Sequence, residues 1–235
     1  GIYSKNCREW IIADLAIVMA GYISVPFFPS LNGKELAYIM DYGDVDALFV
    51  GKIETWDDIK DDLPEEMALI KFPQYAGCSN VTKGREWSEF INSHKPMQNP
   101  HIPKLSDLWT IIFTSGTTGN PKGVMLSYQA IHGIKVVLDD PENPLGIKHD
   151  GNNEFISYLP LNHIFERVVI EWTSFRYGGT ISFVESIDTF GKNLKDVQPH
   201  VFAAAPRVWT KLQLGILSKF PQKKLDTLLK IPLVS

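Results

Sequence analysis

Short apolar runs alternate with longer amphipathic segments over the first fifty residues. The runs 1–4, 23–28 and 47–51 are rich in branched and aromatic side chains, which is typical of strands. The segments between them carry apolar residues at helical spacing. This alternation predicts an α/β fold, in which βα repeats build a layered parallel sheet.

Each of the two predicted helices begins with a pair of residues that is typical of a helix N-terminus. Asn6 with Glu9, and Asn32 with Glu35, match the pattern in which an N-cap side chain and a carboxylate three residues later bond to each other's backbone. The first helix is expected to end at Gly21.

The stretch 10–28 approaches the roughly 20 apolar residues that span a bilayer. It contains Asp14 and closes with Gly21 and Pro26, so we interpret it as a buried helix followed by a strand. The sequence begins with neither a charged segment nor a cleavage site, and it gives no sign of a secretory signal.

The periodic signal weakens after residue 51. A strand is predicted over 67–72, and a helix over 85–94 from its spacing of Trp87, Phe90 and Ile91.

Three prolines then fall within residues 95–107, which favours an extended connector over a regular element. We place a junction in this connector, with a first α/β subdomain portion over 1–104 and a second over 105–235.

Residues 114–123 read TSGTTGNPKG and separate two apolar runs, 108–113 and 124–128. Glycines let backbone amides approach a ligand, hydroxyl groups add donors, and Lys122 adds a positive charge, so a loop of this composition after a strand suits a polyphosphate. The two apolar runs are also able to pair as a β-hairpin whose turn needs no ligand. The residue types alone leave both interpretations open.

Two other nucleotide-binding patterns do not fit this loop. A Walker phosphate loop has Gly-Lys followed by Ser or Thr and opens into a helix, whereas Lys122 stands between Pro121 and Gly123 and precedes a predicted strand. The GxGxxG pattern of nicotinamide enzymes does not occur here either. The loop therefore belongs to neither class.

His163 lies in the stretch LPLNHIFERV, 159–168, where a strand is predicted to give way to a helix. A polar residue at such a junction often only satisfies local backbone groups. Glu166 and Arg167 follow at the start of the helix, where an ion pair explains them as well as a ligand does. The stretch itself does not decide between these roles.

The stretch HVFAAAPRVW, 200–209, is predicted to form a strand, a turn and a helix. Pro206 suits the first helical turn, and Trp209 is expected to pack inward. Arg207 either contacts a phosphate or anchors a neighbouring carboxylate.

Composition and charge narrow the setting. With 235 residues and 44% apolar composition, the chain can bury a substantial core. A formal net charge of -4 gives no electrostatic reason to expect nucleic acid or an anionic membrane as a partner. Cys7 and Cys78 fit neither a zinc site nor a disulfide framework, which favours reduced thiols in a cytoplasm over a disulfide in an oxidising compartment.

Residues 113–128, FTSGTTGNPKGVMLSY, resemble the phosphate-binding signature of the adenylate-forming enzymes, which include acyl-CoA synthetases, luciferases and the adenylation domains of peptide synthetases. Three further stretches, 1–10, 159–168 and 204–209, look like those of long-chain fatty-acid CoA ligases. The similarity covers most of the chain and predicts a partial large domain of such an enzyme.

The resemblance implies a two-step reaction. A fatty-acid carboxylate attacks the α-phosphorus of ATP to give an acyl adenylate and pyrophosphate, and the thiol of coenzyme A then displaces AMP to give the thioester. Mg²⁺ accompanies ATP. The family also implies the roles of individual residues: His163 lies beside the carboxylate and the α-phosphate, Thr114 helps to bind Mg²⁺, and the triphosphate contacts Thr114, Ser115, Gly116, Thr117, Thr118, Gly119 and Lys122.

One position departs from the expected family pattern. We expect Ala directly before the histidine, and the larger, polar Asn162 stands there, which is expected to alter the rim of the acyl site. Aromatic residues at helical spacing further on are more typical of a core than of an acyl channel, and we leave them outside the site: Trp172, Phe175 and Tyr177.

The resemblance also implies parts that these 235 residues do not contain. Relatives carry, further downstream, a magnesium-binding glutamate, a ribose-binding aspartate and a small C-terminal domain with a catalytic lysine. We therefore expect a portion of a longer enzyme, nearly inactive alone, that works in the cytoplasm or at the periphery of a membrane. Two alternatives stay open: a nucleotide-binding module without chemistry, and a relative that adenylates an aryl or amino acid.

Overall fold

A computed structural model of the chain describes residues 1–114, 121–140, 146–228 and 230. The chain separates into two compact units, Gly1–Val201 and Phe202–Ser235, and each is described by itself. The junction predicted near residue 104 stays a prediction.

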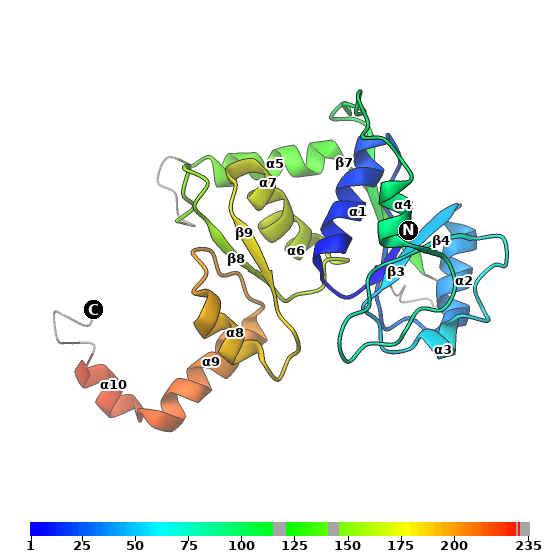
Figure 1. The fold of residues 1–235 in the computed structure, drawn as a ribbon. Helices are drawn as coiled ribbons and strands as arrows, with labels where there is room; N and C mark the ends of the chain where they lie inside the picture. Colours follow the sequence, from blue (N-terminus) through cyan, green and yellow to red (C-terminus); the bar gives the residue numbers. More distant parts are fainter. Residues whose placement is uncertain (115–120, 141–145, 229, 231–235) are drawn as a thin grey trace. The chain divides into compact units, whose positions relative to one another are not determined.

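A five-stranded sheet forms the first part of the Gly1–Val201 unit (Figure 1). Its strand order is β2-β1-β3-β4-β5, and every neighbouring pair is parallel, as the alternating pattern predicts. The strands are β1 Ile2–Ser4, β2 Pro26–Phe27, β3 Ala47–Gly51, β4 Ala68–Lys71 and β5 Arg85–Glu86. The helices that follow them are α1 Arg8–Met19, α2 Gly33–Tyr42, α3 Trp56–Ile59 and α4 Trp87–Asn92.

Helices cover both faces of this sheet, because side chains alternate between the faces along each strand. Ile2 is buried in a cluster with Trp10 of α1. Tyr3, the next residue, is buried in a cluster with Leu36 and Met40 of α2. The sheet is therefore apolar on both sides, which explains the nearly continuous apolar runs of its strands.

Only one of the two predicted capping pairs caps a helix. Asn32 accepts a hydrogen bond from the backbone of Glu35 at 2.9 Å, and Glu35 accepts one from the backbone of Asn32 at 3.1 Å, so this prediction is confirmed. The prediction for Asn6 and Glu9 is wrong. The N-cap of α1 is Cys7, which makes no side-chain capping bond. The Asn6 side chain does not cap the helix, because it bonds to the loop after β8 instead.

The second part of this unit holds two pairs of strands and a row of helices. Strands β6 Leu108–Thr114 and β7 Lys122–Ser127 pair antiparallel, and β8 Glu154–Ser157 and β9 Thr180–Phe183 pair parallel. Helix α5, Tyr128–Leu138, follows β7, and α8, Phe190–Val197, follows β9. Between β8 and β9 three helical segments run on without a break: α6 Ile164–Glu166, the π-helix η1 Arg167–Trp172, and α7 Thr173–Tyr177.

Pairing and packing contacts join these strands to the five-stranded sheet and its helices. Ser24, just before β2, forms a parallel bridge with Thr110 of β6. Leu161, in the loop after β8, is buried in the cluster that contains Ile2 and Trp10. The predicted connector over residues 95–107 contains no helix or strand and runs between α4 and β6.

The Phe202–Ser235 unit consists of α9, Pro206–Lys219, and α10, Gln222–Leu228. Pro206 stands in the first turn of α9, as predicted. The predicted strand before it is wrong: Val201 forms an isolated bridge to Phe155 of β8, and residues 202–205 have no strand structure. Trp209 does not pack inward: it is 50% exposed and makes an edge contact with the ring of Phe202.

No helix among the described residues combines the length and the apolar character that crossing a bilayer requires. In the apolar stretch 10–28 only the part up to Met19 is helical, and Asp14 within it is buried.

Candidate active site

The glycine- and hydroxyl-rich segment comes between β6 and β7 in the sequence, and these two strands pair antiparallel. Thr114, the last residue of β6, is the Cα partner of Lys122, the first residue of β7. Both side chains are exposed. Thr114 Oγ1 donates to the carbonyl oxygen of Lys122 over a long distance, 3.5 Å, and among the described residues no group donates to this hydroxyl oxygen. The predicted contacts Ser115, Gly116, Thr117, Thr118 and Gly119 lie outside the described residues.

The hairpin that we considered as the alternative explanation is therefore present, and it is compatible with ligand binding. Strand β6 anchors it, because Trp109, Thr110, Ile112 and Phe113 are buried. Strand β7 is the outer strand, with Met125 67% exposed. The arrangement presents Thr114 and Lys122 at the open end of a firmly packed strand.

His163 is the N-cap residue of α6, which begins the helical row after β8. Its Nδ1 accepts a hydrogen bond from the backbone N–H of Phe165 at 3.3 Å. A neutral imidazole that accepts at Nδ1 carries its proton at Nε2. The local backbone role considered for this histidine is real, and it leaves an exposed N–H donor at the other ring nitrogen.

Two polar side chains fix the loop that leads to His163. Asn6 donates to Ser157 Oγ at 2.8 Å and to the carbonyl oxygen of Leu159 at 2.6 Å, and it accepts from the N–H of Leu161 at 2.9 Å. Glu166 accepts from the N–H of Tyr158 at 2.9 Å. The loop is thus held from the β1–α1 junction and from its own helix.

The carboxyl group of Glu166 is 1% exposed and forms no ion pair among the described residues. Burial raises its pKa to about 7, although hydrogen bonds from Ser157 and from the backbone of Tyr158 and Leu159 oppose the shift. The ion pair considered for Glu166 is therefore not formed.

Arg167, by contrast, is the centre of a buried ion network. Its Nη2 donates to the two carboxylate oxygens of Asp14 at 2.7 and 2.6 Å, and its Nη1 donates to Thr110 Oγ1 at 2.8 Å. Its Nε lies 3.5 Å from Glu171 Oε2, one turn further along the helix. The ion-pair interpretation of Arg167 is confirmed, both within the helix and to another part of the chain.

Glu171 is fully buried beside this guanidinium, and neither of its carboxyl oxygens has a hydrogen-bond partner among the described residues. Burial raises the pKa of Glu171 well above its usual range, and the negative charge of Asp14 raises it further, while Arg167 lowers it. Burial and the neighbouring Asp14 thus favour the protonated form of Glu171. One feature of the sequence points to this network: Asp14 is the single acidic residue in the apolar stretch 10–28.

A model of the family described as AMP-binding enzyme matches residues 1–233. The chain belongs to the AMP-binding enzyme family. Among its relatives, long chain acyl-CoA synthetase 4 of Arabidopsis thaliana is 32% identical over 93% of this chain and 34% of its own length. Long-chain-fatty-acid--CoA ligase 1 of Homo sapiens is 30% identical over 90% of this chain and 32% of its own length.

The fold of this AMP-binding chain also occurs in solved structures. The ATP-bound MatB of Rhodopseudomonas palustris has a TM-score of 0.64 at 19% identity, over 83% of this chain and 37% of its own. The chain spans about a third of the length of the relatives that it matches. The predicted α/β fold class and the predicted family are thereby confirmed.

The residues at the hairpin end fit a magnesium ion that is shared with phosphates. Mg²⁺ prefers oxygen ligands and usually binds through one or two protein groups together with substrate phosphates. Thr114 offers a hydroxyl oxygen there to which no described residue donates. Among the described residues no cluster of three or more His, Cys, Asp or Glu side chains could hold a metal, so a cage built from such side chains is not the kind of site this part of the chain offers.

Asn162, the residue that departs from the expected family pattern, is 2% exposed. Neither its Nδ2 nor its Oδ1 has a hydrogen-bond partner among the described residues. An unsatisfied buried amide costs roughly 1–3 kcal/mol. Its effect on an acyl site stays a prediction.

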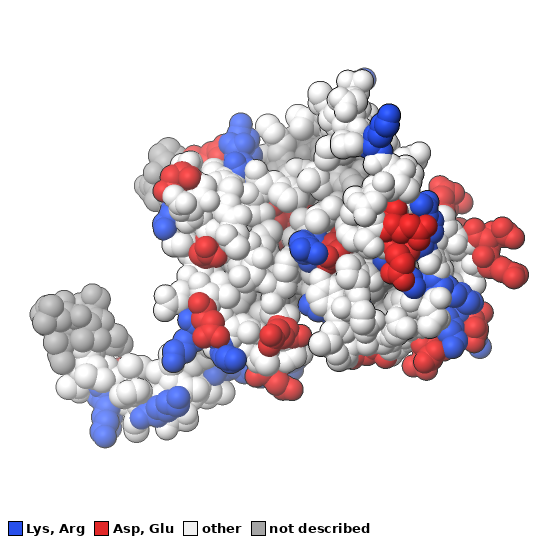
Figure 2. Space-filling model, viewed as in Figure 1, with Lys and Arg blue, Asp and Glu red and all other residues white. Residues whose placement is uncertain are grey.

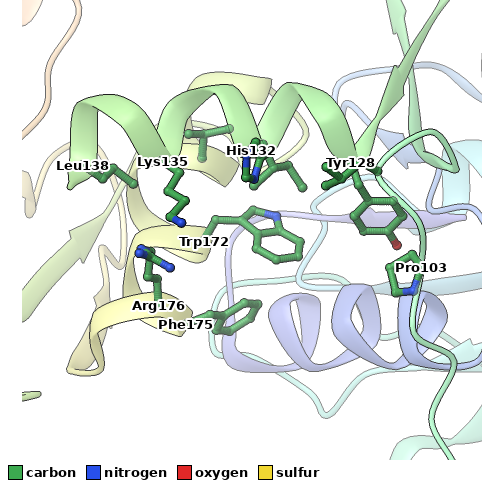
Figure 3. A pocket seen from close by; sticks show the side chains of 11 residues that line it. Pro103, Tyr128, His132, Lys135, Leu138, Trp172, Phe175 and Arg176 are labelled. Carbon is green, nitrogen blue, oxygen red and sulfur yellow. The ribbon is translucent and has the colours of Figure 1, made fainter. Parts of the chain in front are cut away.

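A cavity of about 410 Å³ lies between α5 and the helical row (Figure 3). Two of the aromatic residues that we left outside the site, Trp172 and Phe175, line it, whereas Tyr177 hydrogen-bonds to Asp139. Lys135 and Arg176 lie at one end, and both pair with Asp139, at 3.9 and 2.5 Å. Asp139 offsets one of these two positive charges. The rest of the lining is mainly apolar: Pro103, Leu105, Tyr128, Ile131, Leu138, Val168, Trp172 and Phe175, with His132.

Acidic and basic side chains lie side by side on the face drawn in Figure 2, most densely around α2, α3 and β4. Mixed charge of this kind is typical of an ordinary solvated surface.

Proposed function

We propose that the protein to which this chain belongs joins a long-chain fatty acid to coenzyme A in two steps driven by ATP. The observation that carries the proposal is the β6–β7 hairpin, which presents Thr114 and Lys122 on either side of the glycine-rich segment. Relatives named as long-chain acyl-CoA synthetases support the choice of acid and of thiol.

In the first step a carboxylate oxygen forms a bond to the α-phosphorus of ATP, and the bond between that phosphorus and the bridging oxygen breaks to release pyrophosphate. Such a reaction needs positioning and charge stabilisation more than covalent help. Lys122 places a positive charge beside the leaving phosphates. Ser115, Gly116, Thr117, Thr118 and Gly119 are proposed to contact the same phosphates through hydroxyl and amide groups.

His163 is proposed to act at the other side of the reacting phosphorus. Its Nε2 proton is free to donate, because Nδ1 is engaged by the backbone of Phe165. A donor at this place would stabilise the charge that develops on the phosphoryl oxygens. The capping bond orients the ring for that role.

Mg²⁺ is proposed to bind with the Thr114 hydroxyl group as one protein ligand. When bound, the ion withdraws electron density from the phosphoryl group and neutralises phosphate charge.

In the second step the sulfur of coenzyme A forms a bond to the acyl carbon, and the bond from that carbon to the AMP oxygen breaks. We assign no residue of this chain to this step. We further infer that the protein works in a reducing compartment, the cytoplasm, since Cys7 and Cys78 are both free thiols.

The test is acid-dependent exchange of labelled pyrophosphate into ATP by the full-length protein. Exchange with palmitate, and none without an acid, is the expected result. Lys122→Ala should lower kcat/KM for ATP by roughly a hundredfold, whereas Lys192→Ala, at another exposed lysine, should not.

Other acids separate this proposal from its alternatives. Clear preference for an aryl or amino acid would reject the fatty acid and keep adenylation. Binding of magnesium-ATP by calorimetry, without exchange on any acid, would indicate a nucleotide-binding module without chemistry.

A further inference from the structure

The buried network around Arg167 connects three elements that are distant in the sequence. Its guanidinium binds Asp14 of α1 and Thr110 of β6 while belonging to the π-helix η1. Ser24 closes the network, since its hydroxyl donates to Asp14 and its carbonyl oxygen accepts from Thr110 Oγ1 at 2.7 Å. The Arg167 side chain is 0% exposed, and its guanidinium carbon lies 4.1 Å from the centre of the Trp109 ring.

Both groups of the proposed reaction centre lie close to this network along the chain. Thr114 stands four residues after Thr110 on β6, about 13 Å along an extended strand. His163 stands four residues before Arg167, about one helical turn. Any shift between β6 and η1 would therefore move Thr114 and Lys122 relative to His163.

The residue types in the network suit a role in fixing the positions of β6 and η1 better than a role in stabilising the fold. Burying a guanidinium with two carboxyl groups is costly, and apolar side chains of similar volume often stabilise an interior as well or better. What apolar groups lack is a fixed direction, which the four donor–acceptor pairs of Arg167 and Thr110 supply. The network also lies on a π-helical segment, a form that is frequent at functional sites.

We propose that Arg167 is a positioning residue for adenylation: it holds strand β6, and with it Thr114 and Lys122, in a fixed register with His163. This inference rests on the proposed function.

The experiment uses the full-length protein and measures kcat and KM in the exchange reaction. Arg167→Lys keeps the charge, but its single ammonium group cannot bind Asp14 and Thr110 in the same fork geometry. Thr110→Val keeps the shape of that side chain and removes the hydroxyl link. Two substitutions at Ile170, to Val and to Ala, serve as matched controls, because this buried residue of η1 lies outside the network.

We expect Arg167→Lys and Thr110→Val each to lower kcat by about tenfold to a hundredfold, with KM for ATP changed less than threefold, since small misplacements of reacting groups have effects of this size. The double variant should lose no more kcat than the worse single variant, because both substitutions disrupt the same hydrogen bond, between Arg167 and Thr110. The Ile170 controls should lower the unfolding midpoint and keep kcat within threefold of wild type, per folded molecule.

The inference is overturned if the network variants lose no more kcat than Ile170 controls of equal stability, or if their losses multiply in the double variant. Wild-type protein that fails to exchange with any acid would overturn the proposed function, and this inference with it.

Discussion

The imidazole of His163 has two hydrogen-bonding positions with different duties. Nδ1 caps α6, and Nε2 is the proposed donor to the reacting phosphoryl group. Substitution can separate them, since asparagine is a good N-cap whose shorter side chain does not reach the place of Nε2.

We expect His163→Ala to lower kcat of exchange by about 10²–10³-fold and to cost about 1 kcal/mol of stability. His163→Asn should restore the stability and leave the rate low. Exchange kinetics and thermal unfolding of both variants measure the two effects. If both variants keep kcat within threefold of wild type, His163 has no role in the reaction.

The raised pKa of Glu166, about 7, leads to a prediction about pH. Between its ordinary value of 4.5 and about 7, the folded state keeps a proton that the unfolded state has released. The free energy of unfolding therefore falls as pH rises through this window, by on the order of 3 kcal/mol at 1.36 kcal/mol per unit. Glu171 acts in the same direction.

Glu166→Gln isolates the contribution of Glu166, because the amide oxygen still accepts from the backbone of Tyr158 but carries no charge. The variant should match wild type at pH 5 and be the more stable protein at pH 8, as measured by unfolding midpoints. Equal differences at both pH values would show that Glu166 does not titrate in this window.

At the scale of elements, two asparagines with the same sequence context serve unlike purposes. Asn32 closes a capping box with Glu35 inside α2. Asn6 bonds to three positions of the loop before His163.

Asn32→Ala should cost about 1 kcal/mol, the usual value of an N-cap. Asn6→Ala should cost more, about 2–3 kcal/mol, because it leaves partly buried backbone groups without partners. Hydrogen exchange distinguishes the two: amides of 158–163 should exchange faster only in the Asn6 variant. If both variants protect this loop equally, Asn6 does not hold it.

The same pair explains which elements could be predicted from the sequence. The parallel sheet, α2 and its cap arise from neighbours along the chain, and local patterns encode them. The bond between Asp14 and Arg167 joins positions 153 residues apart, so no local pattern contains it. The sequence shows Asp14 as a lone acidic residue in an apolar stretch, but it does not indicate that Arg167 is its partner.

The candidate site divides in the same way. The order of residues in the hairpin and the resemblance that they carry predicted Thr114, Lys122 and His163 as candidates. The proton position on His163, the burial of Glu166 and the missing partners of Asn162 depend on packing between distant segments, and sequence reasoning did not reach them.

At the scale of the whole chain, the two units differ in how they are stabilised. The four buried apolar clusters found among the described residues belong to Gly1–Val201. The described residues of α9 and α10 include none that is buried, and large apolar side chains such as Leu214 and Ile216 are at least half exposed. The first unit should therefore fold without the second.

We expect a protein of residues 1–201 to unfold cooperatively within about 4 °C of one of residues 1–235, because removing α9 and α10 changes stability by no more than about 1 kcal/mol. Residues 1–199 are the matched control. This shorter protein lacks Val201, which is 4% exposed, and the bond from the N–H of His200 to the carbonyl oxygen of Glu154, so its midpoint should fall further. Thermal unfolding followed by circular dichroism compares the three, and a 1–201 protein without a cooperative transition would mean that the first unit depends on the second.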